Sequence, residues 1–430
     1  MTTPSGDKKR DHFSLQCFSC KTEYKIDDYG KFYRCRKCGD LLEVVLRPGA
    51  GKLSFSDKLP GIWKYIGVLP LWNSANIVSL SEGGTPLLEC RNLGRKLGLD
   101  ALYVKFEGLN PTGSFKDRGM TVGISKAKEL GYKRTMCAST GNTSASLAAF
   151  AAKAQMRCIV LVPKGKIAMG KMAQAIAYGA EIFQVDGNFD DSLRVASDIC
   201  ERDNTTLLLN SLNPFRIEGQ KTVSFEIVEQ LGGGVPDALV LPVGNGGNIS
   251  AAWKGFTELF HDGLGDLFGI DEHRSEGPRM IGVQAAGAAP IVKAFKEGKR
   301  NAIEPVSEPH TEASAINIGS PVSWRKVLSA IYSSKGLADS VTDEEIFSAQ
   351  QLLASSEGLF VEPASATPIA FLVKSAGKRS EEFERLKDKV VVCICTGNGL
   401  KDPNALLKTI RSDQIQTISA DARSLETVLA

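Results

Sequence analysis

A lysine at position 116 has the setting of a reactive amine. Lys116 follows a Pro–Thr–Gly turn, and the residues after it have the pattern of a helix for which Ser114 is the expected N-cap. The dipole at a helix N-terminus disfavours the cationic form of a nearby lysine. The sequence therefore predicts a nucleophilic amine able to form a Schiff base with a cofactor aldehyde, the alternative being an ordinary solvated lysine.

Three polar turns, at residues 138–144, 242–248 and 396–403, each follow an apolar run and are rich in glycine, asparagine or threonine. A glycine-rich turn between a strand and a helix directs backbone N–H groups towards a phosphate. Each turn taken alone also fits an ordinary loop, because these residue types are common in loops.

The elements that must position these turns alternate between short apolar runs and helical patterns. The apolar runs are residues 102–106, 135–138, 158–162, 181–185, 206–209, 238–241, 280–283 and 389–394. This alternation predicts an α/β fold with open parallel sheets covered by helices on both faces. Ligand loops in such sheets lie at the carboxyl ends of the strands, which is where the polar turns occur.

The composition excludes several classes of function. The chain has 430 residues, 43% of them hydrophobic and 23% charged, which suits two globular lobes and a small module. A formal net charge of +3 gives no reason to expect a nucleic-acid partner. No apolar run reaches the ~20 residues of a membrane span, and the N-terminus does not resemble a secretory signal. We expect a cytoplasmic protein.

Four of the ten cysteines form two Cys-x-x-Cys motifs, Cys17 with Cys20 and Cys35 with Cys38. This spacing lets two turns converge on one zinc ion, as in a zinc ribbon. A structural role is favoured, because so short a segment lacks its own core, although a binding surface for nucleic acid or a protein is the alternative. The remaining cysteines are expected to be small core residues: Cys90, Cys137, Cys158, Cys200, Cys393 and Cys395.

In their order along the chain, these segments resemble the fold-type II family of pyridoxal phosphate (PLP) enzymes and, within it, the threonine synthases. The resemblance covers residues 80–403, notably 82–87, 113–120, 139–144, 210–222, 244–248, 311–316, 362–366 and 396–403. It implies two parallel-sheet lobes similar to the tryptophan synthase β chain, with PLP in the cleft between them. The expected division is a tail (1–12), the zinc-ribbon-like module (13–50), a large lobe (51–112 and 221–430) and a small lobe (113–220).

The resemblance assigns the cofactor to residues in each turn. It gives Lys116 the Schiff base and the general acid–base role, and it places Asn142 on the cofactor's phenolic oxygen. Thr396 would face the pyridine nitrogen. Arg118, if close, would disfavour protonation of Lys116, and its alternative is a salt bridge to Asp117. The cofactor phosphate is assigned to Gly244, Asn245, Gly246, Gly247 and Asn248.

The resemblance also assigns the substrate. Ser139 and Thr140 would bind its carboxylate, and Arg216 would clamp its phosphate, unless Arg216 instead pairs with Glu218 along a helix. Glu362 is expected to be an N-cap or a buried hydrogen-bonding group. The remaining phosphate ligands would be Thr143, Asn210, Ser211 and Asn248.

The activity implied is that of a PLP-dependent lyase that converts O-phospho-L-homoserine and water to L-threonine and phosphate, in a homodimer. Three alternatives remain. One is β-replacement on O-phosphoserine of the cysteate synthase type, and another is a threonine or serine dehydratase. The third is an inactive zinc-ribbon adaptor. Because all matched site residues follow residue 80, the N-terminal module is expected to be dispensable for catalysis.

Overall fold

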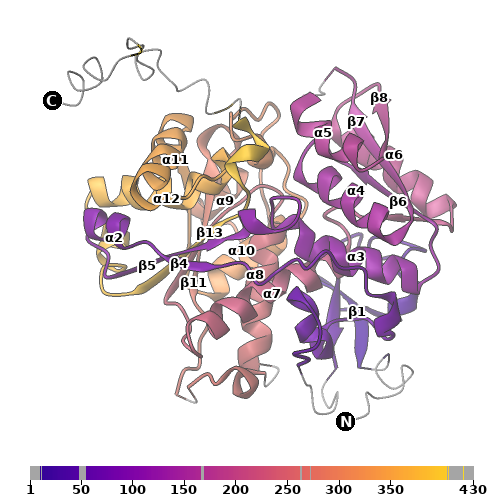
Figure 1. The fold of residues 1–430 in the computed structure, drawn as a ribbon, viewed down its shortest axis with the longest axis horizontal. Helices are drawn as coiled ribbons and strands as arrows, with labels where there is room; N and C mark the ends of the chain where they lie inside the picture. Colours follow the sequence, from indigo (N-terminus) through magenta and orange to yellow (C-terminus); the bar gives the residue numbers. More distant parts are fainter. Residues whose placement is uncertain are drawn as a thin grey trace.

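Three β-sheets organise the chain in the computed structural model, which describes residues 10, 12–47, 55–165, 169–261, 264–271, 273–403, 405 and 420 (Figure 1). Most of the predicted N-terminal tail therefore lies outside the described residues. The four-stranded sheet comes from one continuous section, residues 134–208, whereas the six-stranded sheet takes strands from before and after that section. The two parallel sheets carry the polar turns, and the third sheet is the N-terminal module.

The largest sheet has the strand order β12-β11-β10-β13-β5-β4. Its strands are parallel, except that the short edge strand β4 runs antiparallel to β5. The two middle strands, β10 and β13, are apolar throughout because both faces of a parallel sheet are covered. The strands are β4 (Leu87–Glu89), β5 (Ala101–Phe106), β10 (Ala238–Pro242), β11 (Arg279–Ala285), β12 (Leu337–Val341) and β13 (Val390–Cys395).

Alternate residues of these strands enter two separate cores. Val391 and Cys393 of β13 pack into one core, whereas Val392 and Ile394 pack into the other. The first core includes α2 (Arg91–Leu97), α11 (Asp343–Glu357), α12 (Pro363–Gly377) and α13 (Glu381–Glu384). The second includes α7 (Pro214–Gln230), α8 (Gly247–His261), α9 (Pro290–Lys296) and α10 (Trp324–Ser333).

A second, four-stranded sheet has the order β8-β7-β6-β9 and is parallel throughout. Its strands are β6 (Arg134–Ala138), β7 (Arg157–Pro163), β8 (Glu181–Val185) and β9 (Thr206–Leu208). The helices of this section are α3 (Lys116–Glu129), α4 (Asn142–Ala154), α5 (Met169–Ala177) and α6 (Phe189–Arg202). Helix α7 begins after β9 and continues without a break past residue 220, the predicted boundary between the lobes.

The N-terminal module is a three-stranded antiparallel sheet with the order β2-β1-β3. Its strands are β1 (Phe13–Cys17), β2 (Glu23–Tyr24) and β3 (Leu42–Leu46). The module does not stand alone: Tyr29 and Tyr33 lie in the same core as Leu207 and Phe215. On its other side, Lys326 of α10 lies 3.5 Å from a carboxylate oxygen of Glu43. The module therefore contacts strand β9 of the four-stranded sheet and helices α7 and α10.

The α/β class and the parallel sheets agree with the sequence-based prediction, and the eight apolar runs are all strands. In the six-stranded sheet, strands β4 and β12 were not predicted. They are the two edge strands of this sheet, and β12 contains the half-exposed residues Asp339 and Ser340, which interrupt the apolar pattern. The six cysteines outside the Cys-x-x-Cys motifs are all buried, as expected.

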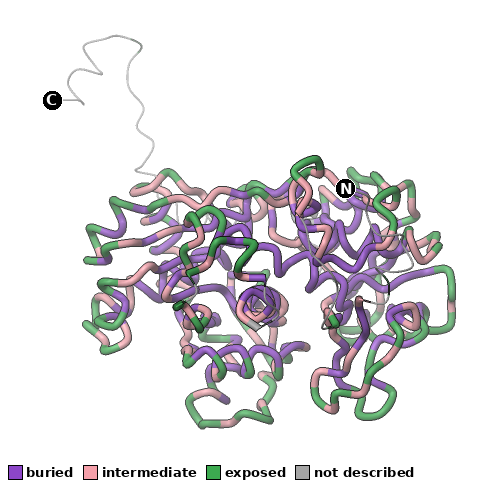
Figure 2. Tube along the Cα trace, turned by 90° about the horizontal axis from the view of Figure 1, so that it is seen from below, coloured by how far each residue is buried: buried purple, intermediate pink, exposed green. Residues whose placement is uncertain are grey.

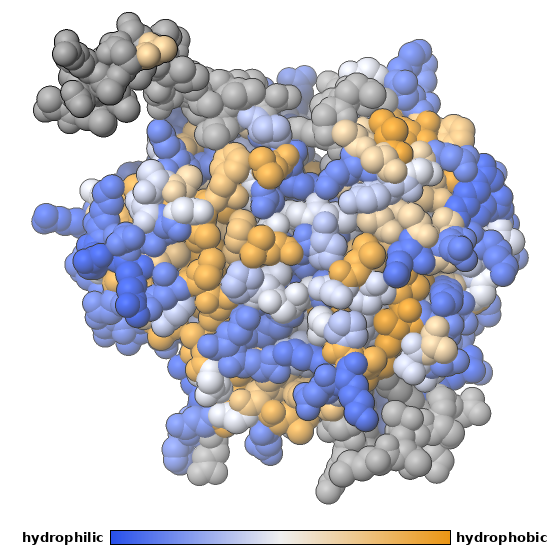
Figure 3. All heavy atoms as spheres, viewed as in Figure 1, coloured by the Kyte–Doolittle hydropathy of each residue, from blue (hydrophilic) through white to orange (hydrophobic). Residues whose placement is uncertain are grey.

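Buried residues occupy the interior of both halves, and exposed residues follow the outer loops (Figure 2). The face in Figure 3 mixes hydrophilic side chains with scattered hydrophobic ones. None of the helices in the described part of the chain combines the length and the apolarity needed to cross a membrane.

Candidate active site

The loop before Lys116 is paired with the polar turn that follows β13. The Phe115 amide donates to the carbonyl of Thr396 at 2.9 Å, and the Asn398 amide donates to the carbonyl of Gly113 at 2.9 Å. Ser114 and Gly397 form the antiparallel bridge between these bonds. Two predicted turns, nearly three hundred residues apart in the sequence, therefore meet at the start of α3.

Lys116 is the first residue of α3, and its amine lies in an environment that disfavours charge. Burial and, to a smaller extent, Arg216 lower the pKa of Lys116 to about 7, and Glu362 partly opposes both. A lysine with this pKa is partly deprotonated at neutral pH, and the deprotonated amine is the nucleophile. The amine also lies 4.2 Å from the centre of the Phe115 ring. These contacts do not fit a solvated surface lysine.

Two expectations about this helix are wrong. The N-cap of α3 is Phe115, which has no side-chain cap, and Ser114 instead pairs with Gly397. Arg118 does not pair with Asp117 and is not among the groups that shift the pKa of Lys116. Its guanidinium is buried and contacts two carboxylates, Glu107 at 2.6 Å and Glu226 at 2.6 Å.

Asp117 is held by other groups. Its carboxylate accepts hydrogen bonds from the hydroxyls of Thr112 and Ser146, both at 2.6 Å. Together with the Arg118 pairs, these bonds fix the first turn of α3 from several sides. The helix that carries Lys116 is thus anchored by a buried polar network.

Arg216 is buried in the first turn of α7 and is 2% exposed. Its predicted alternative partner, Glu218, contacts Lys221 at 2.6 Å instead. Within the described ranges no carboxylate pairs with Arg216, and its Nε has no hydrogen-bond partner. Burial lowers the pKa of Arg216 to about 10, which leaves it cationic. A buried guanidinium without a counterion is a site for an anion.

The turn at residues 244–248 leads from β10 into the N-terminus of α8. Gly246 has φ +84°, and a Cβ there would collide with Val327 of α10, so only glycine fits. Gly244 packs against Ile316, where a Cβ would lie 3.1 Å from the Ile316 Cα. The Asn248 side chain is buried and its Nδ2 has no partner in the described residues. The turn therefore has the strand, glycine turn and helix arrangement that directs backbone N–H groups towards a phosphate, and its phosphate-binding role stays a prediction.

Asn142 is the first residue of α4 and contacts a buried carboxylate. Its Nδ2 lies 3.1 and 3.0 Å from the two carboxylate oxygens of Glu362, the residue before α12. Glu362 does not cap α12 with its side chain, so its role is the predicted buried hydrogen bond. A Cβ on Gly397 would lie 2.5 Å from Glu362 Oε1, which accounts for glycine there.

Thr396 lies at the end of β13 and is 4% exposed. Its hydroxyl is 2.8 Å from the hydroxyl of Ser365 in α12, and Ser365 also accepts a hydrogen bond from the Gly397 amide at 2.8 Å. Ser365 thus orients both the predicted cofactor residue and the turn after it.

The substrate residues fall into two groups. The turn between β6 and α4 contains Ser139 and Thr140, and Thr143 follows in the first turn of α4. The Ser139 hydroxyl accepts a hydrogen bond from the Gly141 amide at 3.2 Å. Asn210 lies behind this turn, because its side-chain amide forms two 2.8 Å bonds with the backbone of Ala138. The structure therefore gives Asn210 a supporting contact to the Ser139 turn. Ser211 is half-buried in the turn before α7.

Three residues near these turns were not singled out from the sequence. Ser365 is one. Gln220 is buried on α7, with its Oε1 unpartnered among the described residues and 3.7 Å from where a Gly247 Cβ would lie. Asn317 also has a buried Oδ1 that makes no hydrogen bond to any residue that the structure describes. Gln220 could have been predicted from the sequence, because it lies four residues after Arg216 and hence on the same helix face.

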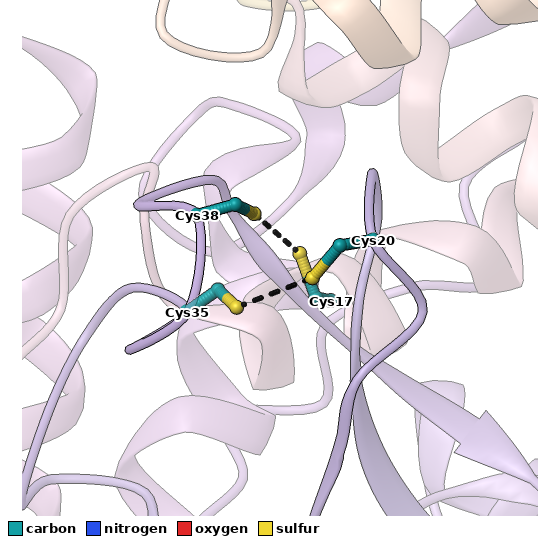
Figure 4. A group of neighbouring side chains, drawn as sticks. All are labelled: Cys17, Cys20, Cys35 and Cys38. Atoms are coloured by element: carbon teal, nitrogen blue, oxygen red, sulfur yellow. Dashed lines mark hydrogen bonds between the residues drawn. The ribbon is translucent and has the colours of Figure 1, made fainter.

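The two Cys-x-x-Cys motifs converge as the spacing predicted (Figure 4). The Sγ atoms of Cys17 and Cys38 are 3.4 Å apart, those of Cys20 and Cys35 are 3.5 Å apart, and all four lie within 4.8 Å of one another. Four thiolates bound to one zinc at about 2.3 Å would have similar separations. The geometry is compatible with a structural zinc site.

Known proteins are similar to this chain in sequence and in fold. Residues 78–397 match the family of pyridoxal-phosphate dependent enzymes. The threonine synthase of Methanocaldococcus jannaschii is 49% identical over 419 residues, which cover 96% of this chain and 98% of that protein. The threonine synthase of Methanosarcina acetivorans is 47% identical over 413 residues, covering 95% and 97%. Maize serine racemase, at 22% identity, shares the fold with a TM-score of 0.63 over 76% of this chain and 91% of that one.

Proposed function

The chain belongs to the pyridoxal-phosphate-dependent enzymes and, among them, to the threonine synthases, and we propose that it converts O-phospho-L-homoserine and water to L-threonine and phosphate. The reaction eliminates phosphate from the γ-carbon and adds water at the β-carbon. The observation that carries the proposal is the buried Arg216 near Lys116, which pairs with no carboxylate among the residues that the structure describes. This arrangement combines a reactive amine with a cation that needs an anionic ligand.

The residues present fit PLP. Lys116 has a lowered pKa and a position at a helix start, and Asn248 presents a buried amide without a partner in the described residues. The backbone from Gly244 to Asn248 would hold the cofactor phosphate, and Asn142 and Thr396 would contact the ring. PLP, when bound, supplies an electron sink for the bonds that break next to the amino group.

We assign the proton transfers to the amine of Lys116. An amine whose pKa is about 7 can accept and return a proton near neutral pH, as removal of the α-proton and protonation at the γ-carbon require. Arg216 lowers that pKa and Glu362 raises it. The other role of Arg216 is to bind the substrate phosphate, with Thr143, Ser211 and Asn248 as further proposed ligands.

The substrate carboxylate is assigned to the turn at the N-terminus of α4. Ser139 and Thr140 offer hydroxyl and amide donors there, and the helix dipole favours a negative charge. Asn210 holds this turn through Ala138, so its proposed contribution to the substrate site is one of support.

The product assay separates the proposal from its alternatives. Purified holoprotein is incubated with phosphohomoserine, with phosphoserine plus sulfite, and with threonine or serine, and phosphate, amino acids and keto acids are measured. We expect threonine and phosphate in equal amounts from phosphohomoserine. Cysteate or keto acids as the main products would support one of the alternative enzymes, and no product would support the inactive adaptor.

We further propose that the four cysteines bind a structural zinc ion. The support is the convergence of four thiols and the direct packing of the module on the rest of the protein. Thiolate ligands in a closed tetrahedral set are typical of structural zinc, whereas a catalytic site keeps one position open. The homodimer, the cytoplasmic location and the lobe boundaries stay predictions.

A further inference from the structure

A tyrosine of the N-terminal module lies behind the proposed anion site. Tyr29 is buried, and its ring meets the ring of Phe215 edge-on at 5.2 Å between centroids. Phe215 directly precedes Arg216 in the first turn of α7. The module is therefore in contact with the helical turn that carries the guanidinium.

Both Tyr29 and Arg216 bury a polar atom that has no partner within the described part of the chain. Among the residues that the structure describes, neither the Tyr29 hydroxyl nor the Arg216 Nε makes a hydrogen bond. An unpartnered buried polar group is unfavourable and is rare in folded proteins. The two atoms are complementary, because the Nε–H is a donor and the phenol oxygen can accept.

The two side chains are close enough to affect each other electrostatically. Burial raises the pKa of Tyr29, and Arg216 is among the groups that oppose this shift. Burial lowers the pKa of Arg216, and Cys137 and Tyr29 oppose it. The groups flanking Arg216 are thus a thiol and a phenol, and both remain neutral.

Tyr33 shows that an unpartnered hydroxyl is not a general feature of this module. It is buried in the same core, and its ring meets that of Tyr29 edge-on at 5.4 Å. Its hydroxyl accepts a hydrogen bond from the Leu208 amide at 3.2 Å. The role of the Tyr33 hydroxyl is therefore accounted for within the fold, whereas that of the Tyr29 hydroxyl is not.

We propose that Tyr29 is a positioning residue for the anion site, whose hydroxyl accepts the Nε proton of Arg216 when a phosphate group binds. The inference rests on the proposed role of Arg216. A guanidinium held at Nε presents its two terminal nitrogens as a fixed pair, the geometry that a phosphate accepts. The N-terminal module thereby contributes to substrate recognition through Arg216.

The test uses the full-length holoprotein with inorganic phosphate as the probe. Tyr29→Phe and Tyr33→Phe remove the same atom from two neighbouring rings, so each is the matched control of the other. Phosphate affinity is measured by titration calorimetry and thermal stability by Tm without phosphate. Steady-state kinetics with phosphohomoserine then separates KM from kcat.

We expect Tyr29→Phe to weaken phosphate binding and raise KM, each about tenfold, as the loss of one hydrogen bond to a charged group predicts. Its kcat should stay within about twofold and its Tm should not fall, because the lost hydroxyl makes no hydrogen bond to any described residue when no phosphate is bound. Tyr33→Phe should lower Tm and leave phosphate affinity unchanged.

Two results would overturn the inference. One is equal phosphate affinity in the wild type and Tyr29→Phe, and the other is equal weakening by both substitutions, which would indicate general loosening of the core. Either result leaves the proposed function intact. Failure of the wild type to bind phosphate would instead contradict the role of Arg216, and this inference would fall with it.

Discussion

The guanidinium of Arg216 lowers the pKa of Lys116 across the contact between helices α7 and α3. The two helices approach closely because Gly119 and Gly219 each face the backbone of the other helix. A Cβ on Gly119 would lie 2.7 Å from the carbonyl oxygen of Arg216, and one on Gly219 would lie 2.7 Å from the carbonyl carbon of Arg118. The same cation that we assign to the substrate phosphate therefore also keeps the amine reactive. Binding an anion at Arg216 would weaken this effect and favour protonation of Lys116.

We predict that Lys116→Ala abolishes turnover while the protein stays folded, because no other amine would take the place of Lys116. Absorbance in the range expected of lysine-bound PLP, roughly 410–430 nm, should disappear. Borohydride reduction of the wild type followed by peptide mass spectrometry should find the cofactor on Lys116. A modified peptide from any other lysine would contradict the assignment.

Arg216→Ala is expected to weaken the use of phosphohomoserine by roughly 2–5 kcal/mol in transition-state terms, the cost of losing a desolvated charged contact. PLP absorbance should persist. Arg134→Ala, which removes a half-exposed guanidinium paired with Asp203, is the control and should leave activity near that of the wild type. Loss of PLP in Arg216→Ala, without a specific loss of phosphate-substrate use, would give Arg216 a structural role instead.

The lowered pKa of Lys116 predicts how the stability of the apoprotein depends on pH. Between about pH 7 and the usual value of 10.5, the folded amine is deprotonated while the unfolded one is still protonated. The free energy of unfolding should therefore rise with pH in this window, by up to about 1.4 kcal/mol per pH unit from this group. Below pH 7 both states are protonated and the contribution is constant.

Denaturant unfolding of the apoprotein from pH 6 to 9, beside Lys116→Met, measures this contribution. Met is neutral and of similar length, so the variant lacks the titration. The stability advantage of the variant should shrink as pH rises above 7. An advantage that does not change with pH would show that Lys116 titrates normally.

Metal analysis of the intact protein should find one equivalent of zinc, and Cys20→Ser should lose it while Cys90→Ser, in the core of the large sheet, keeps it. Loss of the metal should lower the Tm of the whole protein, and should not merely unfold the module. The reason is that Tyr29 and Tyr33 share a core with Leu207 and Phe215. A truncation at residue 51 that stays folded and fully active would contradict this coupling.

The elements and turns of the fold could be predicted because their signals are local. Each buried strand, such as Val390–Cys395, is a continuous apolar run, and the turns after β6, β10 and β13 are marked by Gly, Asn and Thr. The edge strand β12 escaped prediction because Asp339 and Ser340 break its apolar pattern.

Partnerships between distant residues were harder to predict. Arg118 pairs with Glu226, more than a hundred residues away, and Asn210 is engaged by the backbone of Ala138. The packing of the N-terminal module against the rest of the protein could not be predicted for the same reason. Its motifs revealed the cysteine cluster, but nothing local marks Tyr29 as a neighbour of Phe215.

The most direct test of the account is turnover of phosphohomoserine in water enriched in oxygen-18. Elimination from the γ-carbon breaks the carbon–oxygen bond, and water then adds at the β-carbon. The account therefore predicts threonine with one labelled oxygen at its hydroxyl, and phosphate released without label. Homoserine together with labelled phosphate would show simple hydrolysis at phosphorus, and would contradict the proposed function.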